Sequence, residues 1–140
     1  MSMNLKTSAE SGFLLAVAGG SFSLAEAKRT FIEMLEAVAR ARVRKVLFDG
    51  RGLTGNPGSM ERFYYGMFAA ETVGKYADRG VSRTTRFAYV LKPPVLDPRR
   101  FGETVAVNRG MHVKAFDNFD DALGWLGIAS ADNPDSGDGK

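Results

Sequence analysis

A glycine-rich segment, GRGLTGNPGS at residues 50–59, is the first candidate for chemistry in this chain of 140 residues. Gly50, Gly52 and Gly55 fit the spacing G-x-G-x-x-G directly after the apolar run KVLFD, a pattern found in dinucleotide-binding turns. In such a turn the third glycine opens the helix that receives the pyrophosphate, whereas here the tripeptide NPG intervenes before helix propensity begins. No lysine follows a glycine in this loop, so a Walker A phosphate loop is excluded. The pattern favours a turn that needs positive φ angles, and we expect no nucleotide and no cofactor.

Ser59 suggests a different chemistry, because its hydroxyl could either cap the helix expected to follow or carry a phosphate. Capping is the simpler interpretation, and Glu61 would add a favourable charge to the first turn. A phosphate on Ser59 would still face the positive end of the helix and the guanidinium of Arg62. Thr54 is a second hydroxyl in the same loop that could be phosphorylated. The residues alone leave both interpretations open.

The other chemically capable residues form no recognisable catalytic or metal-binding set. The chain has no cysteine and a single histidine, His112, which excludes disulfides, thiol nucleophiles and thiolate metal sites. Asp49 and Asp97 fall near the expected C-terminal ends of strands, where α/β proteins usually place their sites, but Asp97 is explained as a helix cap. We therefore predict no metal site, no catalytic residues and no enzymatic activity.

An alternation of strands and helices must position these residues. Short apolar runs bounded by glycine or proline predict strands at residues 13–18, 45–49, 86–91 and 112–116, and a weaker edge strand at 3–10 that forms a hairpin with the first. Helical spacing and end signals predict helices at about 24–40, 60–77, 98–109 and 119–127. The order β-β-α-β-α-β-α-β-α predicts an α/β fold, with a four- or five-stranded mixed sheet covered by about four helices. Residues 1–128 are expected to form one domain, followed by a disordered acidic tail at 129–140.

Single residues mark where these helices begin and end. Ser23, Asp97 and Asn118 are expected to cap the first, third and last helices. Gly110 is expected to stop the third helix in the left-handed conformation.

The second predicted helix carries more aromatic residues than one buried face requires. Steps of 100° place Phe63 and Met67 on the stripe that faces the core, as part of a series that begins at Met60. Tyr64, Tyr65 and Phe68 then spread along one flank toward the outside. These three aromatic residues either widen the contact with the core or form an exposed apolar patch of the kind that marks a partner surface.

Composition and charge restrict the class of protein. The net charge is +3, and the acidic residues near the C-terminus make the rest of the chain more basic still. No base-stacking or groove-reading motif accompanies this charge, so we expect no nucleic-acid partner. The sequence has no signal peptide and no apolar run long enough to span a membrane, which predicts a cytoplasmic protein without a transmembrane segment.

The strand and loop KVLFDGRGLTG and the closing segment FGETVAVNRGMHVKAFDNFDDALGWL resemble the small bacterial STAS-like proteins, which have the anti-sigma-factor-antagonist fold. The resemblance covers residues 3–127. It implies a non-enzymatic protein that binds partner proteins and is switched by phosphorylation of a serine at the start of the helix after the central strand. Ser59 is the positional match, although GNPGSMERF stands where that family usually has D-S-S/T-G-L.

Together these observations predict a non-catalytic protein-protein interaction module, either self-associating as a dimer or regulatory, that uses the loop from Arg51 to Ser59 and the second helix. The predicted partner-binding residues are Arg51, Thr54, Ser59, Arg62, Tyr64, Tyr65 and Phe68. The alternative is a carrier of a small molecule or lipid, which requires an enclosed apolar cavity of about several hundred Å³.

Overall fold

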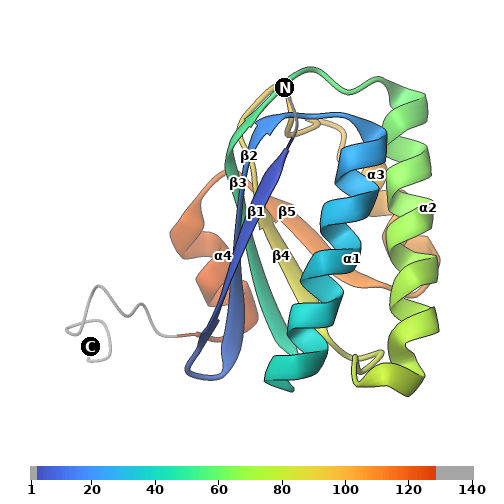
Figure 1. The fold of residues 1–140 in the computed structure, drawn as a ribbon. Coiled ribbons are helices and arrows are strands. Elements are labelled where there is room, and N and C mark those ends of the chain that lie inside the picture. Colours follow the sequence, from blue (N-terminus) through green and yellow to red (C-terminus); the bar gives the residue numbers. More distant parts are fainter. Residues whose placement is uncertain (1–2, 129–140) are drawn as a thin grey trace.

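The computed structural model describes residues 3–128, in which a five-stranded sheet carries helices on both faces (Figure 1). The strands are β1 (Asn4–Glu10), β2 (Phe13–Ser21), β3 (Lys45–Thr54), β4 (Arg86–Val90) and β5 (His112–Phe116). The helices are α1 (Leu24–Ala41), α2 (Ser59–Lys75), α3 (Phe101–Asn108) and α4 (Phe119–Leu126), and a short 3-10 helix, η1 (Tyr76–Arg79), follows α2. The predicted α/β class, order of elements and mixed sheet are confirmed. The tail predicted at 129–140 lies outside the described residues.

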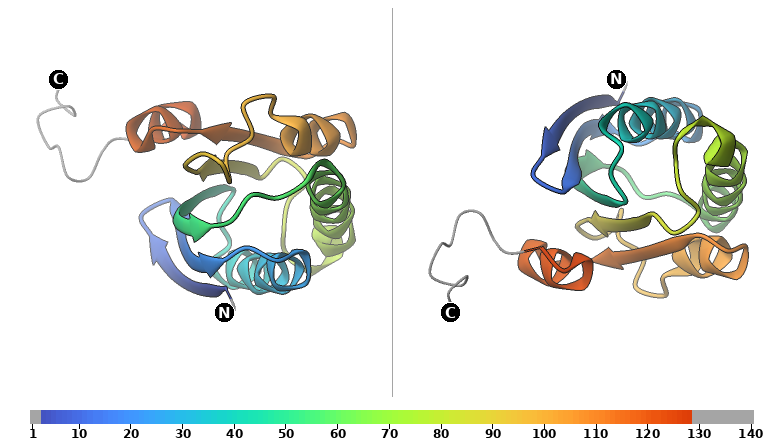
Figure 2. Two further views of the ribbon diagram at one scale, coloured as in Figure 1. Left: turned by 90° about the horizontal axis from the view of Figure 1, so that it is seen from above. Right: turned by 90° about the horizontal axis from the view of Figure 1, so that it is seen from below.

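The strands lie side by side in the order in which they occur in the chain, β1-β2-β3-β4-β5. β1 and β2 form the predicted antiparallel hairpin, with Asn4 opposite Gly19, and the other three pairings are parallel. Because parallel crossovers between successive strands are right-handed, α1, α2 and α3 come to lie on one face of the sheet. α4 covers the other face, as Figure 2 shows from above and below.

Two hydrophobic cores result from this arrangement. The larger lies between the sheet and α1, α2 and α3, and includes the fully buried residues Phe31, Met34, Leu35, Val46 and Phe87. The smaller lies under α4 and consists of Leu47, Ala88, Val90, Ala122, Leu123 and Leu126. The central strands are therefore apolar on both faces, which explains why β3 and β4 read as continuous apolar runs.

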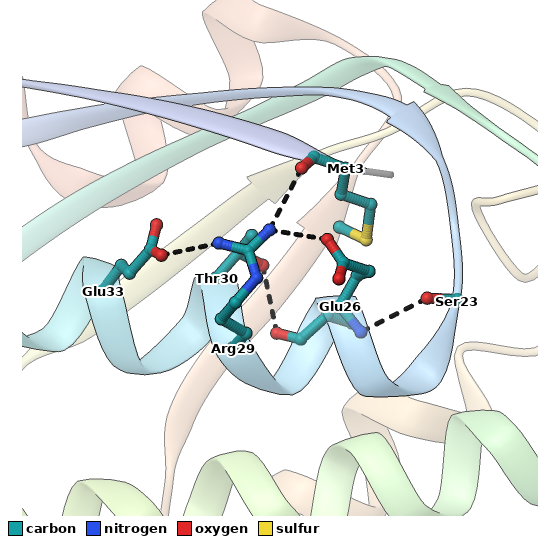
Figure 3. Close-up of polar contacts among 7 residues, drawn as sticks. Met3, Ser23, Glu26, Arg29, Thr30 and Glu33 are labelled. Atoms are coloured by element: carbon teal, nitrogen blue, oxygen red, sulfur yellow. Dashed lines mark hydrogen bonds and ion pairs between the residues drawn. The ribbon is translucent and has the colours of Figure 1, made fainter. Parts of the chain in front are cut away.

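The start of α1 ties the N-terminal segment to the domain (Figure 3). The Ser23 hydroxyl accepts a hydrogen bond from the amide of Glu26 at 3.2 Å, which confirms the predicted cap. The Arg29 guanidinium donates to the carboxylates of Glu26 and Glu33, each at 2.6 Å, and to the carbonyl of Met3 at 3.1 Å. One arginine thus joins the chain before β1 to the first turns of α1.

The glycine-rich segment belongs mostly to a strand. β3 extends to Thr54, so the prediction that it ends at residue 49 was too short and Gly50 and Gly52 lie within it. A Cβ atom on Gly50 would lie 2.7 Å from the side chain of Leu91, and Gly52 pairs with Gly19 of β2. Only Gly55 in this segment has a positive φ, at 118°. Gly50 and Gly52 thus allow neighbouring groups to pack closely against β3. The prediction that they belong to a loop was wrong.

The third helix also begins later than predicted. The Asp97 carboxylate accepts hydrogen bonds from the amides of Arg99 and Phe101, at 3.1 and 2.8 Å, and so holds a turn before α3. Arg100 is the N-cap residue and has the left-handed φ of 53°. The later end signals are confirmed, because Gly110 has a φ of 94° and the side chain of Asn118 accepts from the amide of Asp121 at 2.9 Å.

Candidate functional site

The side of α2 that the sequence pattern assigned to the core is only partly the side that is buried. The buried positions of the helix are Gly66, Ala69, Ala70, Thr72 and Val73. Met60, predicted to begin the buried stripe, is 59% exposed, and Phe63 and Met67 are only partly buried. The predicted stripe is therefore right at Ala70, a later member of the series, and wrong at Met60. Apolar residues lie on most sides of this helix, so their spacing does not determine which side faces the sheet.

Tyr65 and Phe68 point inward instead. The Tyr65 ring packs edge-on against Phe31 with centroids 6.0 Å apart, and its hydroxyl lies 2.7 Å from that of Tyr89 on β4. The Phe68 ring also meets Phe31 edge-on, at 6.3 Å. Both residues therefore widen the core contact, as one of the two alternatives stated. Tyr64 is 44% exposed, so the exposed-patch alternative applies to it.

An exposed apolar patch, here called the α2 outer surface, consists of Met60, Phe63 and Tyr64 of α2 with Phe101 of α3. The Phe63 ring lies 5.5 Å from that of Tyr64 and stacks on Phe101 at 6.4 Å. The Arg109 guanidinium lies 5.7 Å from the Phe63 ring centroid. Phe101 is 39% exposed. Sequence analysis missed Phe101 and Arg109, because only the packing of α3 against α2 brings them to this face.

Ser59 does not cap α2. The N-cap residue is Gly58, whose amide donates to the Glu61 carboxylate at 2.9 Å, and Ser59 is the first residue of the helix, with its side chain exposed. The helix begins with the serine, so the serine oxygen is not placed to accept from the amides of the first turn. Thr54 is also exposed, at the end of β3, and its hydroxyl donates to the carbonyl of Gly20 at 3.4 Å.

Arg62 joins two loops. Its guanidinium donates to the carbonyls of Pro57, Val95 and Pro94, at 3.1, 2.8 and 2.8 Å. These carbonyls belong to the β3–α2 and β4–α3 connections, which meet beyond the C-terminal ends of the central strands. The arginine predicted to face a partner or phosphate therefore holds these two connections against α2.

Arg51 lies on the opposite face of the sheet, away from the other predicted site residues. It donates to both oxygens of Asp49 at 2.9 Å, and its guanidinium lies 4.9 Å from the ring centroid of Phe119 in α4. Successive strand residues alternate between faces, so the odd-numbered pair Asp49 and Arg51 points toward α4. The residues predicted as one site are thus divided between two faces.

The Asp49–Arg51 pair gives a pH-dependent prediction. Hydrogen bonding to the Arg51 guanidinium, opposed by burial, holds the pKa of the Asp49 carboxyl below its ordinary value of 3.8. A carboxyl with a lowered folded-state pKa stabilises the fold above the unfolded-state pKa, and this contribution is lost as the pH falls through the folded-state value. We expect Asp49→Asn to lose less stability than the wild type between about pH 5 and pH 2.5 in urea unfolding.

The control for this comparison is Asp78→Asn, which changes an exposed carboxylate that has no salt bridge among residues 3–128. This variant should follow the pH dependence of the wild type. Parallel curves for Asp49→Asn and the wild type would contradict the prediction.

A cavity of about 130 Å³ lies between the sheet, α2 and α3, and is partly open to solvent. Its wall is largely apolar, with Phe48, Leu53, Ala69 and Ala106 among the lining residues, and the hydrogen-bonded Tyr65 and Tyr89 also line it. Burial raises the pKa of both tyrosine hydroxyls, so both stay neutral at physiological pH. The cavity is smaller than the several hundred Å³ expected of a lipid carrier.

The groups considered for catalysis lie apart or are engaged in structural bonds. His112 is exposed at the start of β5, at the opposite end of the sheet from Asp49, which is the last residue of β3 to pair with β4. Glu103 accepts a hydrogen bond from the amide of Ala115 at 2.8 Å. Within residues 3–128, no three His, Asp or Glu side chains are grouped so that they could hold a metal ion.

Within the same residues, no helix combines the length and the apolar character needed to cross a membrane.

Comparison of the fold with solved structures supports the resemblance seen in the sequence. An anti-sigma factor antagonist from Mycobacterium paratuberculosis matches with a TM-score of 0.56 and 15% identity, over 89% of this chain and 94% of that one. An uncharacterised protein of the DUF3478 family with a SpoIIAA-like fold, from Shewanella loihica PV-4, has a TM-score of 0.49 and 20% identity, over 89% of this chain and 93% of that one. No family model and no curated protein matches the chain. The first likeness confirms the predicted STAS-like fold.

Proposed function

We propose that this protein is a non-catalytic, regulatory protein-interaction module whose contact surface is the α2 outer surface. The observation that carries the proposal is that Met60, Tyr64 and Phe101 are exposed around the half-buried Phe63, on two adjacent helices. Exposed apolar side chains that form a continuous patch on a protein surface usually mark a site where another molecule binds. The fold is consistent with this role, because a solved structure that shares it is an anti-sigma factor antagonist.

A second copy of this chain is the partner that we propose. The surface is apolar apart from the Arg109 guanidinium, which lies over the ring of Phe63, and α2 carries charges of both signs beyond it, at Glu71 and Lys75. A two-fold axis through such a surface would bring its apolar side chains against those of the second copy. Aromatic side chains and methionine are also enriched in the cores of such interfaces.

The double variant Met60→Ala/Tyr64→Ala is expected to weaken self-association at least about tenfold, because it removes two large side chains from the centre of the proposed interface. Sedimentation equilibrium across a dilution series would measure the dissociation constant, and far-UV circular dichroism would verify the fold. Ile32→Ala is the matched control, since Ile32 is an apolar residue of α1 with 37% exposure and lies outside the α2 outer surface. Normal association of a folded double variant, or a wild type that remains monomeric at millimolar concentration, would contradict self-association.

Phosphorylation of Ser59 is the regulatory part of the proposal. The exposed hydroxyl adjoins Met60, so a phosphate there would place about two negative charges beside the apolar surface. In the same dilution series, Ser59→Asp is expected to weaken association and Ser59→Ala to leave it unchanged. Equal dissociation constants for both variants and the wild type would contradict regulation by phosphorylation at Ser59. They would not affect the proposal that the α2 outer surface is an interface.

A further inference from the structure

We propose that the cavity beneath α2 binds a small, mainly apolar, uncharged molecule that carries one hydrogen-bond acceptor, such as an aromatic ketone or ester. This inference goes beyond the proposed interaction function, because it concerns the inner side of α2 and not the α2 outer surface. It rests on the size of the cavity, on the tyrosine pair in its wall and on the engagement of the neighbouring polar groups.

The cavity is large enough for a ligand with one aromatic ring. Its volume of about 130 Å³ is close to the ~150 Å³ of an engineered apolar protein cavity that binds benzene. The wall offers apolar contact from the sheet at Phe48, from α2 at Ala69 and from α3 at Ala106. An occupant would thus contact three elements at once, whereas a long acyl chain would exceed the space.

The tyrosine pair supplies a hydrogen-bond donor. The hydroxyls of Tyr65 and Tyr89 lie 2.7 Å apart, so one O–H donates to the other oxygen. Two hydroxyls carry two hydrogens, and this bond uses one of them. Within residues 3–128, neither hydroxyl has another hydrogen-bond partner, so the second O–H has no protein acceptor there. An acceptor atom on a ligand in the cavity would complete the pair.

The remaining polar groups at the cavity are engaged elsewhere. Thr30 donates to the carbonyl of Ala27, and Glu103 accepts from the amide of Ala115. The Arg62 guanidinium donates to three loop carbonyls.

Two further charged side chains line the cavity and are also bonded to backbone groups: Arg100 donates to the carbonyl of Asp97, and the Asp97 carboxylate accepts from two amides of its own loop. A charged ligand group would have to displace one of these bonds or lose its hydration unpaired, and either is costly. The wall therefore selects a neutral acceptor.

Acetophenone and α-methylstyrene are suitable probes, because they have nearly the same shape and only acetophenone has a carbonyl oxygen. We expect acetophenone to bind the wild-type protein about five- to tenfold more tightly, which corresponds to one hydrogen bond. Titration followed by two-dimensional NMR would give both dissociation constants. The largest shifts are expected at Tyr65, Ala69 and Tyr89.

The double variant Tyr65→Phe/Tyr89→Phe tests the role of the hydroxyls. It removes both members of the hydrogen bond and keeps both rings, so it leaves no unpaired polar group and is expected to fold. It should bind the two probes with equal affinity. Tyr89→Phe alone keeps the Tyr65 hydroxyl as a donor and should retain the preference for acetophenone.

Three results would overturn the proposal. One is that neither probe shifts the resonances of the cavity residues in the wild type. Another is equal affinity of the wild type for both probes, and the third is a preference for acetophenone that survives in the folded double variant. None of these results bears on association through the α2 outer surface, so the two proposals can fail separately.

Discussion

Replacing Gly66 by alanine is expected to lower the free energy of unfolding by about 2 kcal/mol, although the same change favours most helices by about 1 kcal/mol. A Cβ atom at this position would lie 2.6 Å from the carbonyl oxygen of Gly102 and 3.2 Å from the Cβ of Val105. The obstacle is the backbone of α3, which cannot rotate away as a side chain can. The two helices would have to separate, and overpacking of this kind costs about 3 kcal/mol at its upper range.

Gly124→Ala is the matched control for this prediction. Gly124 also lies within a helix, and a Cβ atom there would meet no heavy atom within 4 Å. This variant should be more stable than the wild type by about 0.5 to 1 kcal/mol, because only helix propensity acts. Urea unfolding of both variants would measure the difference. A Gly66→Ala protein as stable as Gly124→Ala would show that α2 and α3 are not in backbone contact.

Arg62→Ala is expected to lower the free energy of unfolding by about 3 kcal/mol. The guanidinium donates from all three of its nitrogens, and each bond runs from a charged group to a carbonyl. Without it, the β3–α2 and β4–α3 connections lose their common anchor. We therefore also expect faster amide hydrogen exchange at residues 54–56, 58 and 95–97.

Two further variants separate geometry from charge at this site. Arg62→Lys keeps the charge but cannot present three donors in one plane, so it should recover less than half of the lost stability. Arg99→Ala removes an exposed arginine from the same connection and should change stability by less than about 0.5 kcal/mol. Full recovery by lysine would show that charge alone matters at residue 62.

The fold could be predicted from the sequence because each element carried its own local signal. Short apolar runs marked the strands, and Ser23, Asn118 and Gly110 marked helix ends that the structure confirms. The boundaries failed where tertiary contacts decide them. β3 continues through Gly50 and Gly52 because β2 pairs alongside it, and no local pattern of the sequence reports that pairing.

The candidate site was less predictable for the same physical reason. The buried side of an amphipathic helix is recognised by the contrast between its apolar and polar faces. α2 has apolar residues on most sides, so Met60 was assigned to the wrong face, and two alternatives remained open for Tyr65. Arg51 and Arg62 are close in sequence, but strand alternation and helix geometry send them to opposite sides of the sheet. The cavity and the tyrosine pair join residues from β4 and α2, which only the folded chain brings together.

The sequential order of the strands has a consequence for how the chain acquires its structure during synthesis. Each strand after β1 pairs with the strand that precedes it in the chain. When a new strand leaves the ribosome, the strand with which it pairs has therefore already been synthesised. Each pairing closes only the segment that has just emerged, which keeps the entropic cost of each closure small. The sheet can therefore grow one strand at a time from the N-terminal hairpin, and α4 can cover its second face last.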